Sequence, residues 1–101
     1  MHEKDLRLEK YKKILLDIIR KKLPKCKIFL FGSRARKDNQ PGADIDLALD
    51  MGRKIDFKII LSLYNDIEDT TIPLTVDLVD LHSVSGSLKN EIKKEGILWA
   101  A

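Results

Sequence analysis

Apolar and polar positions repeat along this chain with two different periods, and these periods predict its helices and strands. Residues 5–22 and 56–67 carry apolar side chains at every third or fourth position, which is the spacing of one face of an amphipathic helix. Residues 26–31, 43–49 and 74–81 are short runs rich in β-branched, aromatic or alternating apolar side chains, which is typical of strands.

Shorter segments complete the order of elements. Ser33 is positioned to cap a short helix directly after the first predicted strand. Ser85 or Ser87 is positioned to cap a last helix, which ends before Gly96. Residues 97–99 form either a final short strand or a docking tail. This order predicts a small α/β domain in which helices flank a mixed β-sheet.

Length and composition limit the class of protein. A chain of 101 residues that is 44% hydrophobic and 35% charged is expected to fold as one globular domain over residues 1–101. That size leaves no room for a second substrate domain, so another molecule must present any acceptor. The N-terminal region is charged without an apolar signal core, and no apolar run approaches membrane-spanning length. We therefore expect a cytoplasmic protein with no membrane contact.

Charge is distributed unevenly along the chain. The net charge is +3, but residues 1–27 hold ten basic and four acidic side chains and the remainder is net negative. A basic first helix could contact nucleic acid, an acidic partner or a triphosphate. A solvated outer helix face explains the same pattern and is favoured. Aromatic residues are not interleaved with the basic ones, which argues against single-strand recognition, so nucleic-acid binding is the third hypothesis for function.

Two aspartates, Asp44 and Asp46, are predicted to share one face of the second strand. Side chains two residues apart on a strand point the same way, with Cα atoms roughly 6.5–7 Å apart. Carboxylates this close repel each other unless a cation compensates. Hard oxygen ligands suit Mg²⁺ or Mn²⁺, as one ion or as a pair roughly 3.5–4 Å apart. An exposed D-x-D on an edge strand is the simpler alternative.

The turn at Gly32 and Ser33 is a candidate phosphate site. A strand that ends in glycine and opens a helix presents free backbone N–H groups to an anion, and the serine hydroxyl adds another donor. Arg34 and Arg36 follow closely enough to add phosphate contacts. The alternative is an ordinary strand-to-helix turn. The Walker A pattern is absent.

Asp77 is the candidate third carboxylate. A mixed sheet could place it beside the strand that carries Asp44 and Asp46, where it would complete the site and accept a proton from an incoming hydroxyl. Asp80 is the competitor, on the opposite face of the same strand. Asp77 is favoured because apolar residues flank it on both sides. For either residue the alternative is a carboxylate that faces water.

In combination these motifs resemble the nucleotidyltransferase superfamily of polymerase-β type, and most closely its smallest members, the minimal nucleotidyltransferases (MNT). The family pattern is a G-S-x-A-R turn, an S/A-D-x-D-L strand and a v-D-l-v strand, found here at residues 32–36, 43–47 and 76–79. The resemblance covers nearly the whole chain. Members often carry Gly where this chain has Lys37, and Ser where it has Ala43.

The resemblance implies a nucleotidyltransferase fold and a Mg²⁺-dependent enzyme that transfers AMP from ATP. Two metal ions are expected, with Mn²⁺ as the alternative metal. It assigns three residues to catalysis and metal binding, namely Asp44, Asp46 and Asp77. It assigns three more to the nucleotide, namely Gly32, Ser33 and Arg36.

The resemblance also implies a partner. Minimal members typically pair with a helical HEPN protein, a ribonuclease toxin, and the nucleotidyltransferase is its antitoxin, which can attach AMP to a toxin tyrosine. The alternative is an antitoxin that neutralises its partner by binding alone. An exposed apolar surface around helix 56–67 or the Trp99 tail would indicate the interface.

Overall fold

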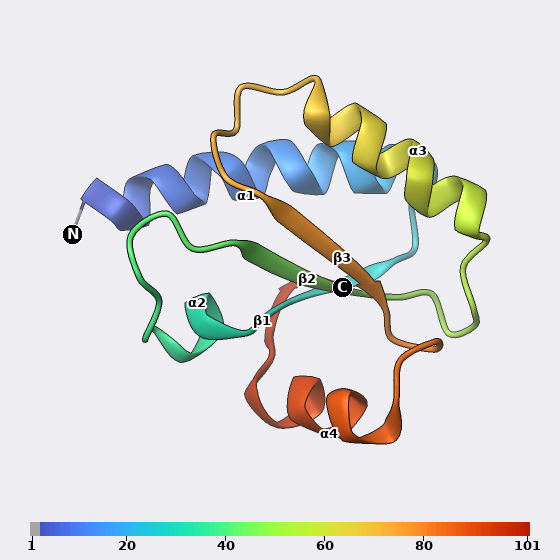
Figure 1. Ribbon diagram of the computed structural model, residues 1–101. Helices are drawn as coiled ribbons and strands as arrows, with labels where there is room; N and C mark the ends of the chain where they lie inside the picture. Colours follow the sequence, from blue (N-terminus) through green and yellow to red (C-terminus); the bar gives the residue numbers. More distant parts are fainter. Residues whose placement is uncertain (1–2) are drawn as a thin grey trace.

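The computed structural model describes residues 3–101, with side chains from Leu6 onward, and forms helices and strands in the expected order (Figure 1). The elements are α1 (Glu3–Lys22), β1 (Lys27–Phe31), α2 (Ser33–Arg36), β2 (Ile45–Asp50), α3 (Phe57–Glu68), β3 (Val76–Asp80), α4 (Gly86–Glu95) and β4 (Ile97–Ala100). Their ends lie within two residues of the predicted ones, the usual uncertainty of such boundaries. The tail after Gly96 is a strand, and Ser85 caps α4 by accepting a hydrogen bond from Leu88 N.

The four strands form one mixed sheet in the order β3-β2-β1-β4. Strand β1 is antiparallel to both β2 and β4, whereas β2 and β3 are parallel. Parallel neighbours need a long crossover, and α3 provides it. The α/β class and the mixed sheet are therefore confirmed. The register places Asp46 opposite Asp77 and Leu47 opposite Leu78.

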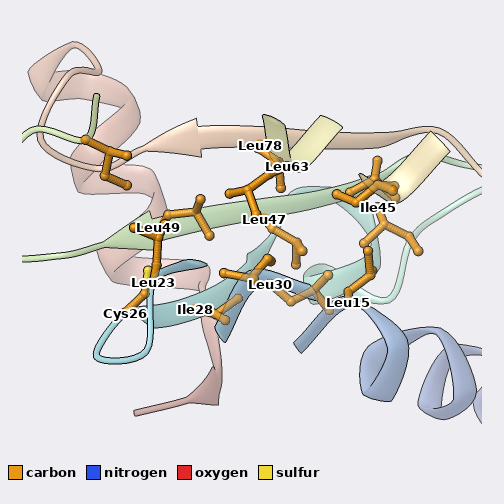
Figure 2. Packing of buried hydrophobic residues seen from close by; sticks show 14 residues of the cluster. Leu15, Leu23, Cys26, Ile28, Leu30, Ile45, Leu47, Leu49, Leu63 and Leu78 are labelled. Atoms are coloured by element: carbon orange, nitrogen blue, oxygen red, sulfur yellow. The ribbon is translucent and has the colours of Figure 1, made fainter. Parts of the chain in front are cut away.

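The main hydrophobic core lies between the sheet and the pair α1 and α3, which run together on one face (Figure 1). Leu15 and Ile19 of α1 and Leu63 of α3 are fully buried there. Figure 2 shows side chains from these helices and from three strands in one continuous cluster. This is the apolar face that strand alternation predicts.

The opposite face of the sheet carries a smaller core under α4. Its buried members are Phe31, Ala48, Leu81 and Ile92. Asp46 lies on this face too, because it is two residues from Ala48. Asp46 therefore lies on the sheet face opposite α1 and α3.

Asp44 lies just outside the strand to which it was assigned. Strand β2 begins at Ile45, whose N–H donates to the Thr75 carbonyl at 2.9 Å. Ala43 N instead donates back to the Gln40 carbonyl at 3.1 Å, which closes a turn. Asp44 therefore joins this turn to the strand. Among the helices within residues 3–101, none is both long and apolar enough to cross a membrane.

Candidate active site

Gly32 joins β1 to α2 in a conformation that favours glycine. Its φ of 74° lies in the region that L-residues rarely adopt. A Cβ added at this position would also collide with Oδ2 of Asp46. The turn and the carboxylate are therefore packed directly against each other, as a phosphate-binding turn beside a metal ligand would be.

Ser33 is the first residue of α2, and Gly32 takes the N-cap position. The prediction that Ser33 caps this helix is therefore wrong. The Gly32 carbonyl accepts from Ala35 N and Arg36 N, both at 3.1 Å. The N–H groups of Ser33 and Arg34, by contrast, have no earlier helical carbonyl to which they can donate, so they remain available to a ligand.

Asp46 is the most crowded of the three carboxylates. It is half-buried and lies opposite Asp77 in the register. Burial raises the pKa of Asp46, and the charges of Asp77 and Asp44 raise it further, against a smaller lowering effect of Arg36. Mutual repulsion of this kind is relieved when a cation binds between the carboxylates.

The donor set fits a hard divalent cation such as Mg²⁺ or Mn²⁺, because it consists of carboxylate oxygens from Asp44, Asp46 and Asp77. As they stand, no three His, Cys, Asp or Glu side chains within the described residues are close enough together to hold an ion. Binding therefore requires these side chains to draw together.

Asp77 has a hydrogen-bond partner that the sequence did not indicate. The Tyr64 hydroxyl of α3 lies 3.1 Å from Asp77 Oδ1. Tyr64 lies on the apolar face of α3, and its ring packs against the main core. The sequence feature that could have indicated this contact is the tyrosine itself. A tyrosine on an apolar helix face has a hydroxyl group that needs a hydrogen-bond partner when the ring is buried.

Asp80, the competitor, binds the loops at the other end of β3. Its Oδ2 accepts from Ile55 N at 2.7 Å and from the Ser83 hydroxyl at 3.0 Å, and its Oδ1 accepts from His82 N at 3.0 Å. These bonds explain its presence without any ligand. The arrangement thus favours Asp77, the residue opposite Asp46, as the third member of the site.

The two arginines of α2 are engaged differently. Arg34 donates through Nε and Nη2 to the Ala43 carbonyl, at 3.1 and 2.9 Å, and so fixes the turn before Asp44. Arg36 is a candidate nucleotide ligand, but here it pairs with Asp38 at 3.1 Å, Glu95 at 3.2 Å and Glu91 at 3.6 Å. The hydrogen bonds that Arg36 donates to the carboxylates of Asp38 and Glu95 raise the pKa of Arg36.

Lys37, where the sequence departs from the family pattern, ends α2 in a left-handed conformation with φ of 63°. It is the sole non-glycine residue with positive φ in the described part of the chain. A glycine would adopt this conformation without strain.

Comparison with known proteins identifies relatives of this fold. The family model described as "Polymerase beta, Nucleotidyltransferase" matches residues 9–100. Comparison with curated proteins finds no match.

Similar solved structures include several toxin–antitoxin complexes. One, crystallised with AMP-PNP, shares 26% identity at a TM-score of 0.76 and covers 89% of this chain and 73% of its own. The MntA-HepT complex shares 25% identity at a TM-score of 0.69, covering 89% and 69%. A third is a tri-AMPylated Shewanella oneidensis HEPN toxin in complex with MNT antitoxin, at 26% identity, a TM-score of 0.69 and the same coverage.

Proposed function

The chain belongs to the polymerase beta nucleotidyltransferase family, and from this premise we propose that it is a Mg²⁺-dependent adenylyltransferase that acts as the antitoxin of a HEPN toxin. The observation that carries the proposal is the register of β2 and β3, which sets Asp46 opposite Asp77 while Gly32 packs against Asp46. This packing supports the proposal that the Gly32 turn binds phosphate beside carboxylates that hold the metal.

Each candidate residue has a role in this proposal. Asp44, Asp46 and Asp77 hold Mg²⁺, with two ions expected and Mn²⁺ as a substitute. When bound, the metal neutralises charge on the triphosphate and on the departing pyrophosphate. The N–H groups of Gly32 and Ser33 bind phosphate oxygens. Arg36 assists after it exchanges its carboxylate partners for phosphate.

The proposed reaction transfers AMP to a hydroxyl. The hydroxyl oxygen forms a bond to the α-phosphorus of ATP, and the bond from that phosphorus to the bridging oxygen breaks. Pyrophosphate leaves with the bridging oxygen, and the proton of the hydroxyl passes to Asp77. Asp77 suits this role because it is exposed, so that an acceptor on another molecule can approach it.

The proposed acceptor is a tyrosine of a HEPN toxin. Support comes from the similar solved structures, which include an MNT antitoxin in complex with a tri-AMPylated HEPN toxin and a toxin–antitoxin crystallised with AMP-PNP. We propose that residues 1–101 act as a single cytoplasmic minimal nucleotidyltransferase domain, and that the toxin supplies the acceptor hydroxyl.

The decisive experiment is incubation of the chain with Mg²⁺, lysate of its host and ATP labelled at the α-phosphate, followed by a denaturing gel. We expect label on a discrete protein band with the wild type, and none with Asp44→Ala/Asp46→Ala. Asp69→Ala removes an exposed carboxylate at the end of α3 and should label normally. The assay is repeated with GTP, CTP and UTP labelled in the same way. If none of the four nucleoside triphosphates gives label, the chain is not a protein nucleotidyltransferase.

A binding-only antitoxin is the second candidate. Two observations favour it: Arg36 is held by three carboxylates, and no three metal-ligating side chains within the described residues lie ready to hold an ion. The same variant separates the two candidates. If Asp44→Ala/Asp46→Ala still neutralises the toxin as well as the wild type does, chemistry is dispensable.

A further inference from the structure

The Tyr64 hydroxyl forms a relay of hydrogen bonds that ends on Asp77. Leu78 N donates to the hydroxyl oxygen at 2.7 Å, and the hydroxyl lies 3.1 Å from Asp77 Oδ1 and 3.2 Å from the Leu78 carbonyl oxygen. A hydroxyl has one proton, so it donates to one acceptor at a time. The charged carboxylate is the stronger acceptor and takes that proton preferentially.

Tyr64 is a firmly held donor. Its ring packs against the main core, and its hydroxyl is fixed by the main chain of Leu78 on the edge strand β3. The bond accepted from Leu78 N polarises the hydroxyl and strengthens it as a donor. Burial raises the pKa of Tyr64; Leu78 opposes this rise and Asp77 adds to it, so the hydroxyl stays protonated at neutral pH.

Asp77 needs such a restraint more than Asp46 does. Asp46 is half-buried against Gly32, whereas Asp77 is exposed on an edge strand, where an aspartate side chain is free to change rotamer. Rotation of Asp77 would remove one of the three ligands from the shared site.

We infer that Tyr64 is a positioning residue for Asp77: it holds Oδ1 and leaves the second carboxylate oxygen free for the metal and for the proton of the acceptor. This inference rests on the proposed function, which assigns those two tasks to Asp77. Groups that hydrogen-bond a metal ligand from outside are common in metal sites, because they fix the orientation of that ligand. The residue is on α3, which the motif pattern does not include.

The test is Tyr64→Phe, which keeps the ring and removes only the hydroxyl. Tyr11→Phe is the matched control, since Tyr11 is the other tyrosine of the chain and also packs against the core. Two measurements are made on each protein: Mn²⁺ binding, by electron paramagnetic resonance, and the kinetics of AMP transfer, which give kcat and KM. We expect Tyr64→Phe to weaken Mn²⁺ binding and lower kcat by about tenfold or more, with KM for ATP nearly unchanged.

A purely structural role would give a different pattern. If Tyr64 only covers the edge of β3, Tyr64→Phe should lower thermal stability without affecting Mn²⁺ binding. If Tyr64 acts through Asp77, adding Tyr64→Phe to Asp77→Asn should not weaken Mn²⁺ binding further. If Tyr64→Phe weakens Mn²⁺ binding as much in the Asp77→Asn protein as in the wild type, the inference is overturned.

The outcomes separate this inference from the proposed function. If the wild type transfers AMP and Tyr64→Phe matches it in kcat and Mn²⁺ binding, the inference fails and the proposed function stands. If the wild type binds Mn²⁺ without transferring AMP, and Tyr64→Phe binds it more weakly, the proposed function fails and the positioning role stands. A wild type that neither binds Mn²⁺ nor transfers AMP overturns both.

Discussion

At the scale of single residues, Gly32 is required for two reasons: its backbone conformation favours glycine, and Asp46 packs directly against it. Replacement by alanine imposes a strained φ and also forces Asp46 to move. We expect Gly32→Ala to lower the free energy of unfolding by about 2–3 kcal/mol, where the strained backbone alone would cost roughly 1–2 kcal/mol. Urea denaturation measures this difference.

The chain provides a matched control for Gly32. Gly52 has a similar φ of 78°, but no atom lies within 4 Å of an added Cβ. Gly52→Ala should therefore lower the free energy of unfolding only by the cost of the strained backbone. Equal losses in the two variants would mean that the contact between Gly32 and Asp46 has no energetic consequence.

At the scale of elements, Asp50 ties the end of β2 to the turn after β3. Its Oδ1 accepts from Gly52 N at 2.8 Å and lies 2.7 Å from His82 Nε2. Burial alone would raise the pKa of Asp50, but the hydrogen bonds from Gly52 and His82 outweigh it, so the pKa is lowered. A lowered carboxylate pKa adds stability above the ordinary aspartate value, and that stability is lost as the pH falls through the folded-state value.

This linkage predicts the behaviour of Asp50→Asn. At pH 7 the variant should unfold at lower urea than the wild type, with a deficit of about 1–2 kcal/mol for lost hydrogen bonds to a charged group. The deficit should shrink as the pH falls below about 4, because the wild-type carboxylate is then protonated as well. Urea midpoints from pH 2 to pH 7 test it, and a constant deficit would contradict the linkage.

The end of α2 yields a stabilising prediction. Lys37 has the left-handed conformation that glycine adopts without strain, and glycine is the residue that the family often carries there. Lys37→Gly should raise the free energy of unfolding by about 0.5–1 kcal/mol, measured by urea denaturation. Lys37→Ala removes the same side chain but keeps the strain, so it should give no gain. A gain from both would assign the effect to the lysine side chain.

The helices and strands followed from local pattern, but the site depended on contacts between distant residues. The alternation in 43–49 predicted β2, yet the backbone bond from Ala43 to Gln40 delayed its start beyond Asp44. Asp77 could be placed beside Asp46 because the family motif suggested it; spacing alone does not fix which strands pair. Nothing in the local pattern joined Tyr64 to Asp77, since that contact arises from how α3 crosses the sheet.

At the scale of the whole molecule, two regions with exposed apolar side chains, one on α3 and one at the edge strand β4, are candidates for contact with the proposed HEPN partner. Phe57 and Leu61, one turn apart on α3, are 69% and 47% exposed. Ile97 and Leu98 on β4 are 40% and 51% exposed. The α3 surface is favoured because α3 reaches Asp77 through Tyr64, whereas β4 is three strands from β3, or roughly 14 Å.

A partner whose tyrosine must reach Asp77 can therefore contact Phe57 and Leu61 at the same time. We expect Phe57→Ser/Leu61→Asn to weaken binding to the HEPN protein by at least about tenfold, because exposed apolar anchors of this kind often dominate an interface. Isothermal titration calorimetry with the purified partner measures the affinity. Mn²⁺ binding should be unchanged, since neither residue is among the carboxylate ligands. Ile97→Ser/Leu98→Asn is the comparison variant. If this variant loses affinity for the HEPN protein while the α3 variant keeps full affinity, the interface lies at the β4 edge. The toxin tyrosine would then have to reach Asp77 across the sheet.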